Sequence, residues 1–69
     1  MEINWHDNSI IKVKVINDEI CIGGNKEALK SLANILNDLS NEDVGSHIHL
    51  DKYNSLHDES NDLIIELIK

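Results

Sequence analysis

The sequence predicts a two-layer α+β domain in which one helix packs on one face of a largely antiparallel sheet. Three observations support this fold class. Residues 25–40 space their apolar side chains at the three- and four-residue steps of an amphipathic helix. Several short stretches alternate apolar and polar residues, as half-buried strands do. The length of 69 residues fits one domain, 1–69, with enough core to cover one face of a sheet but not two.

Three strands are expected before the helix, over residues 2–6, 10–16 and 19–22. The second and third should form a hairpin, because Asn17-Asp18 between them is a two-residue connection that tolerates left-handed geometry. Alternation assigns each strand an inner and an outer face. The side chains expected on the inner faces are Ile3, Trp5, Ile11, Val13, Val15, Ile20 and Ile22.

The helix is expected to begin at Asn25, whose side-chain oxygen can accept a backbone N–H of the first turn. Glu27 in that turn suits the positive end of the helix dipole. Gly23 and Gly24 let the chain turn from strand to helix. The apolar stripe expected to face the sheet contains Ala28, Leu29, Leu32, Ala33, Ile35, Leu36 and Leu39.

Two further strands are expected after the helix, over residues 46–51 and 62–68, joined by a polar loop over residues 52–61. The predicted element order is therefore β-β-β-α-β-β. The side chains expected to face the helix from these last strands are Ile48, Leu50, Leu63, Ile65 and Leu67.

A single helix leaves the other face of this predicted sheet uncovered. A face that is this apolar usually marks a contact surface. Three interpretations stay open: a homodimer with two sheets face to face, docking of a different protein, or cover by the 52–61 loop and sheet twist. The residues expected on this face are Ile10, Lys12, Lys14, Ile16, Cys21, His47, His49, Ile64, Glu66 and Ile68.

The chain is acidic, with 13 Asp and Glu against 6 Lys and a net charge of −7. A negative field of this kind repels nucleic acid and anionic membranes and attracts basic protein surfaces. The lone Cys21 allows no intramolecular disulfide, which indicates a reducing compartment. The N-terminus lacks the features of a signal peptide, and no apolar run has the length of a bilayer span. A cytoplasmic protein is expected.

Few residues are candidates for chemistry. His47, His49 and Asp51 follow one another at two-residue steps, so they share one face of a strand and offer zinc-type ligands. No second ligand cluster has a matching spacing, so ordinary surface histidines are the favoured interpretation. Cys21 and the serines lie in no nucleophile motif, and Gly23-Gly24-Asn25 matches no phosphate-binding pattern. No enzyme activity, metal or cofactor is predicted.

Four segments resemble a known family. They are Ile-Gly-Gly-Asn-Lys-Glu-Ala-Leu at the helix start, Ser-Leu-Ala-Asn-Ile-Leu within it, His-Ile-His-Leu-Asp at 47–51, and residues 60–66. The chain from about Ile20 to its end is similar to the small immunity proteins of bacterial polymorphic toxin systems, in particular the family called immunity protein thirty-two. The N-terminal strands match that family only in character.

The resemblance implies a non-enzymatic protein that binds and neutralises a cognate toxin domain in the bacterial cytoplasm. A basic nuclease domain fits the acidic charge, because such a domain must hold a polyanion. The alternatives are a small homodimeric structural or regulatory module and, less favoured, a metal-binding sensor. The residues hypothesised to face the toxin are Glu42, Asp43, Asp51, Asp58, Glu59 and Asp62.

Overall fold

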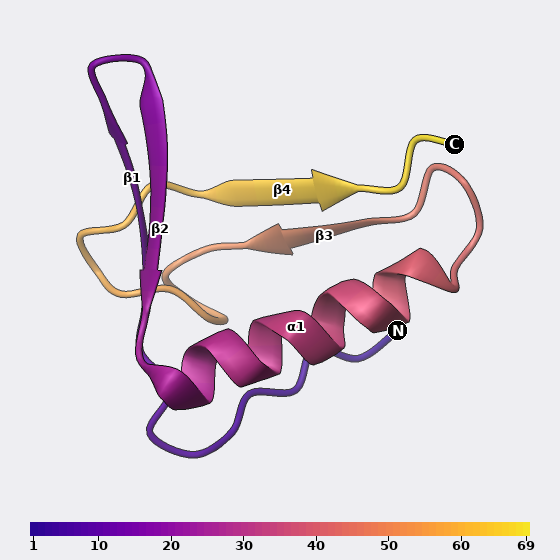
Figure 1. Ribbon diagram of the computed structural model, residues 1–69, viewed down its shortest axis with the longest axis horizontal. Coiled ribbons are helices and arrows are strands. Elements are labelled where there is room, and N and C mark those ends of the chain that lie inside the picture. Colours follow the sequence, from indigo (N-terminus) through magenta and orange to yellow (C-terminus); the bar gives the residue numbers. More distant parts are fainter.

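A computed structural model describes residues 1–69 and contains one helix and four strands. In chain order these are β1 (Ile11–Ile16), β2 (Glu19–Gly24), α1 (Lys26–Ser40), β3 (His47–Leu50) and β4 (Leu63–Glu66). The strands pair as two separate antiparallel sheets, β1–β2 and β3–β4. In Figure 1 the β1–β2 hairpin stands across the direction of β3 and β4, and α1 runs along the side of β3 that is away from β4. The α+β class is confirmed, and the prediction of one continuous sheet is wrong.

The two sheets stay separate because a loop occupies the outer edge of β1, where a further strand would pair. His57 donates its backbone N–H to the carbonyl of Ile11 at 2.9 Å, and Asn61 donates to that of Val13 at 2.8 Å. The Ser60 hydroxyl accepts the N–H of Val13 at 2.6 Å. Loop hydrogen bonds have thus replaced a strand at this edge.

The predicted first strand, residues 2–6, is also wrong, since this segment is irregular. Its predicted alternation is nevertheless correct, because Ile3 and Trp5 pack against the core while their neighbours are exposed. Side-chain hydroxyls hold the segment in place of a neighbouring strand. The indole N–H of Trp5 donates to Ser55 Oγ at 2.8 Å, and the backbone N–H of His6 donates to Ser31 Oγ at 2.8 Å.

The start of α1 is confirmed at the predicted cap. The Asn25 side-chain oxygen accepts the N–H of Ala28 at 3.0 Å, as an N-cap does, and also that of Ile10 at 3.1 Å. Its amide nitrogen donates to the carbonyl of Asn8 at 2.7 Å. One side chain therefore joins the helix start, the base of β1 and the N-terminal segment.

The core is small and lies between the base of the hairpin, α1 and the inner face of β3. In the β3–β4 register Ile48 lies opposite Ile65 and Leu50 lies opposite Leu63, as the alternation predicts. The buried hydrophobic residues are Ile11, Val13, Ala28, Ile35, Leu39, Ile48, Leu50 and Leu56.

The buried stripe of α1 is rotated from the predicted one. Its buried residues are Ala28, Ser31, Ile35 and Leu39, whereas Leu36 is 40% exposed. Ser31 can be buried because its hydroxyl donates to the carbonyl of Glu27 and accepts the N–H of His6, so it has a partner both as donor and as acceptor. This contact draws the serine, and with it the helix, toward the N-terminal segment.

We expect Ile35→Ala to lower the free energy of unfolding by about 2–5 kcal/mol, because Ile35 is 2% exposed and its truncation leaves a cavity. The matched variant Leu36→Ala should cost only about 1 kcal/mol, because that side chain is already partly in water. Urea denaturation of both variants measures the difference. Equal losses would show that α1 presents a different face to the core.

We expect Asn25→Ala to lower the free energy of unfolding by about 1–3 kcal/mol, since it removes the cap and two further hydrogen bonds. Asn37→Ala is the control, because that exposed helical side chain forms no hydrogen bond, and it should change stability by less than about 0.5 kcal/mol. Thermal unfolding followed by circular dichroism compares them. A loss at Asn25 no larger than at Asn37 would contradict the role of the cap.

Candidate partner-binding surface

The β1–β2 hairpin carries an apolar face of which only the base is covered. Asn17 and Asp18 at its turn have φ of 51° and 66°, the left-handed geometry that a tight two-residue hairpin requires. Ile11 and Val13 near the base are 1% and 2% exposed. Toward the tip, the same face carries Val15, Ile20 and Ile22, which are 57%, 69% and 40% exposed.

This bare face continues onto the helix. A Cβ built on Gly24 would lie 3.4 Å from Leu29 Cδ2, so Leu29 lies over the face of β2 that carries Ile22. Leu29 is 49% exposed, and Leu36, two helical turns further on, is 40% exposed. We call this surface the apolar strip. It contains Val15, Ile20, Ile22, Leu29 and Leu36.

The apolar strip was missed in the sequence because its residues were all expected in the core. A six-residue strand is roughly 20 Å long, whereas a helix with its side chains is only about 10–12 Å wide. Since α1 meets the hairpin at its base (Figure 1), it covers the base and leaves the tip bare. The length of the two strands relative to one helix was the available signal.

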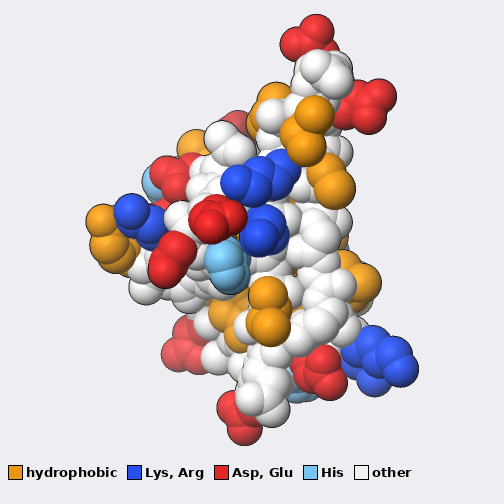
Figure 2. All heavy atoms as spheres, turned by 90° about the vertical axis from the view of Figure 1, so that its left-hand side faces the viewer, with side chains coloured by type: hydrophobic (Ala, Val, Ile, Leu, Met, Phe, Trp, Pro, Cys, Tyr) orange, Lys and Arg blue, Asp and Glu red, His pale blue; other side chains and the backbone are white.

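The predicted outer face is divided between the two sheets. Ile16 and Cys21 on the hairpin are exposed, while Lys12 and Lys14 beside them are half-buried. Figure 2 shows this side of the molecule, with Lys side chains over the middle of the hairpin and Asp, Glu and His close by. The residues on the other sheet and at its end, all exposed, are His47, His49, Ile64, Glu66 and Ile68. Ile10, just before β1, is 57% exposed.

The six hypothesised toxin-facing carboxylates lie in two loops. Glu42 and Asp43 follow α1, and the other four lie between the end of β3 and the start of β4. Those four are Asp51, Asp58, Glu59 and Asp62. The two loops attach to opposite ends of β3, so they do not form one continuous patch.

Three of these carboxylates already have partners. Glu42 lies 3.4 Å from the Met1 amino group, and Asp62 lies 3.6 Å from His49 Nε2. Asp51 Oδ1 accepts the backbone N–H groups of Tyr53 and Asn54, which shapes its own loop. The side chains left without an ion pair or hydrogen bond are Asp43, Asp58 and Glu59.

The histidines and the main groove offer limited chemistry. Asp51 faces its loop rather than His47 and His49, and nowhere do three His, Cys, Asp or Glu side chains gather closely enough to hold a metal ion. An open groove of about 620 Å³ lies between β3, the end of α1 and the N-terminal segment. Its lining residues are Met1, Ile3, Leu39, Glu42, Val44, Gly45, Ser46, His47, Ile48 and His49.

Residues 19–68, more than half of the chain, match the model of the family described as Immunity protein 32. The matched part contains β2, α1, β3 and β4, and with them most of the apolar strip. No curated protein and no solved structure matches the chain with significant similarity. The structure contains no helix with the length and hydrophobicity that a membrane crossing requires. The predicted resemblance is confirmed, and the chain belongs to the immunity protein 32 family.

Proposed function

We propose that this chain is a non-enzymatic immunity protein that binds a cognate toxin domain and neutralises it by covering part of the toxin's surface. The observation that carries this proposal is the apolar strip. A fully buried Val, Ile or Leu side chain contributes about 1.5–3 kcal/mol, so five partly exposed ones represent several kcal/mol that folding leaves unused. Exposed apolar groups of this extent commonly mark a surface that a partner covers.

The charge of the chain favours a basic toxin domain, such as a nuclease. A net charge of −7 would attract such a domain over a distance and speed the first encounter. Within this proposal the two acidic loops guide the approach, and the apolar strip supplies affinity after contact. The exposed thiol of Cys21 supports a reducing compartment, and we propose that the protein acts in the cytoplasm.

Leu29→Gln combined with Leu36→Gln should weaken toxin binding by about tenfold or more, since two apolar anchors are replaced by polar groups. The partner to test is the toxin domain encoded next to this gene, and calorimetry measures the dissociation constant. Ile64→Gln is the control, because Ile64 is 62% exposed but lies on β4, outside the apolar strip. The assignment of the strip fails if the Ile64→Gln control weakens binding as much as the double variant does. The proposed function fails if the unaltered chain does not bind the toxin domain.

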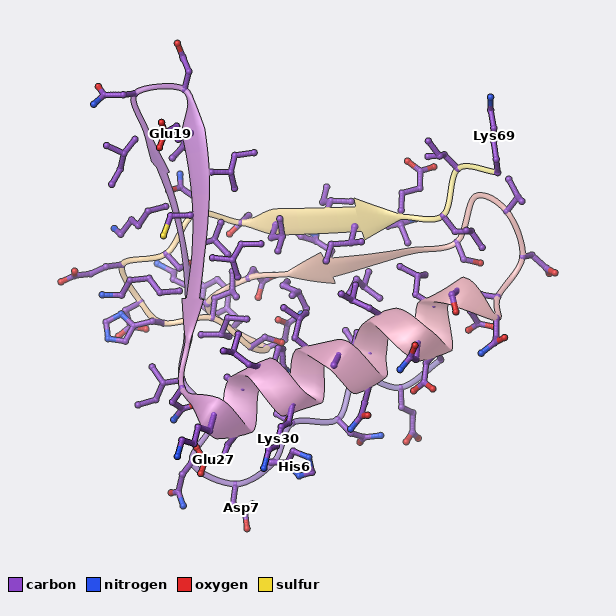
Figure 3. All side chains as sticks on the ribbon, in the orientation of Figure 1. His6, Asp7, Glu19, Glu27, Lys30 and Lys69 are labelled. Carbon is purple, nitrogen blue, oxygen red and sulfur yellow. The ribbon has the colours of Figure 1, made fainter.

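Asp58→Asn combined with Glu59→Gln should slow toxin association several-fold at low salt and reduce the dependence of the association rate on ionic strength. The control removes two charges elsewhere, through Asp7→Asn and Glu27→Gln. Figure 3 shows these residues near the start of α1, away from both acidic loops. Surface plasmon resonance at two salt concentrations measures both rates. Identical association rates for the two variants would remove the loop from the encounter surface.

A further inference from the structure

The two edges of the β1–β2 hairpin differ. The outer edge of β1 is occupied by the loop, which donates to the carbonyls of Ile11 and Val13. In the register, Val13 opposes Ile22 and Val15 opposes Ile20. Since opposing residues of an antiparallel pair direct their N–H and C=O groups either toward or away from each other, those of Ile20 and Ile22 point outward. No turn, loop or cap hydrogen bond uses them.

This free edge of β2 has few of the features that keep sheet edges from pairing. Native edges are commonly protected by proline, by a bulge, by central charges or by cover from another segment. β2 reads Glu-Ile-Cys-Ile-Gly-Gly, with one charge at its first residue and no proline. The β1–β2 register is continuous over all six pairs, so it contains no bulge. The edge can therefore accept another strand.

We propose that a second copy of this chain pairs with β2 along this edge, antiparallel, about a twofold axis at Cys21. The axis sets Ile20 of each copy opposite Ile22 of the other, and both pairs direct their N–H and C=O groups at each other. The two hairpins then form one four-stranded sheet. Cys21 of each copy meets its equivalent at a non-hydrogen-bonded position, where the Cα atoms are about 4.5 Å apart, within the range for a disulfide.

Charge complementarity supports this occupant and this register. Glu19 of one copy lies opposite Gly23 of the second, and the cross-strand neighbour of Gly23 is Lys12. Because Gly23 has no side chain and open space above it, Glu19 can reach over it to Lys12 of the second copy. The two strands are about 10 Å apart, which these long side chains can span together. The twofold axis creates this ion pair twice.

The two neighbouring registers are less favourable. An axis at Ile20 would set Glu19 in a row with Lys14, which already donates to the carbonyl of Glu59, and would pair only residues 19–21 within β2, against 19–23 for the axis at Cys21. An axis at Ile22 would place Glu19 of one copy beside Asn25 of the other, where no cation lies in the same cross-strand row. The edge contact leaves most of the apolar strip exposed, because pairing uses backbone groups at the edge and only Ile20 and Ile22 meet across it, while the strip lies on one face of the hairpin. Self-pairing thus does not require toxin binding, and the two proposals can fail separately.

The test uses the full chain alone. Sedimentation velocity in reducing buffer at about 0.15 M salt, where charge repulsion between acidic copies is screened beyond about 8 Å, should show a concentration-dependent dimer. Mild oxidation should then link the dimer through Cys21 on a non-reducing gel. The control, Cys21→Ser with Ile16→Cys, moves the thiol to β1 on the same exposed face and should cross-link about tenfold more slowly.

Edge and charge variants test the register. Ile20→Pro removes an outward N–H and blocks the approaching strand, so it should abolish the dimer, whereas Ile20→Thr should retain it. If the proline variant does not fold by circular dichroism, charge exchange decides instead. Glu19→Lys and Lys12→Glu should each weaken dimerisation by about tenfold, and their combination should restore it.

A chain that stays monomeric at all concentrations would overturn the proposal. Three other results would overturn it as well: the dimer persists in the proline variant, it fails to link through Cys21, or the double charge exchange does not restore dimerisation. In each case the contact would lie on another surface or in another register.

Discussion

One narrow helix has to cover two small sheets, and this limit shapes the rest of the structure. α1 has fifteen residues and presents one buried stripe, Ala28 to Leu39. That stripe closes the base of β1–β2 and the inner face of β3, and nothing remains to cover the hairpin tip. Eight hydrophobic residues are therefore buried, while twelve large hydrophobic side chains are at least 40% exposed. In a chain of this size the ratio of surface to volume makes such a balance expected.

Because the apolar core is small, side-chain hydrogen bonds position the irregular segments. Asn25 joins the N-terminal segment to the helix start, and Ser31 and Ser55 hold that segment against the core. Ser60 fastens the β3–β4 loop to β1. Each of these short polar side chains meets a backbone or indole group that would otherwise lack a partner. The Ser60 contact, with the backbone bonds from His57 and Asn61, occupies the outer edge of β1 at Ile11 and Val13, so β2 keeps the longer free edge in this hairpin.

The exposed features have separate physical roles. The apolar strip offers area whose burial is favourable, the acidic loops offer a long-range field, and the β2 edge offers unpaired backbone groups. Under the proposed function the first two features meet a toxin. The third is complementary to itself, since a twofold axis at Cys21 sets Glu19 of one copy opposite Gly23 of the other, next to Lys12. Self-pairing would set two apolar strips side by side and enlarge the surface available to a toxin.

The sequence alone determined the features that depend on local physical chemistry. These include the cap at Asn25, the helix that follows it, the turn at Asn17-Asp18, and the two faces of each of the four strands, because caps, turns and alternation involve residues close in the chain. Only the tertiary structure decided which face was covered. The separation of the sheets, the rotation that buries Ser31 and exposes Leu36, and the irregular course of residues 2–6 all depend on contacts between distant segments. Periodicity shows that a residue can be buried, but whether it is buried depends on how much surface the rest of the chain has left to cover it.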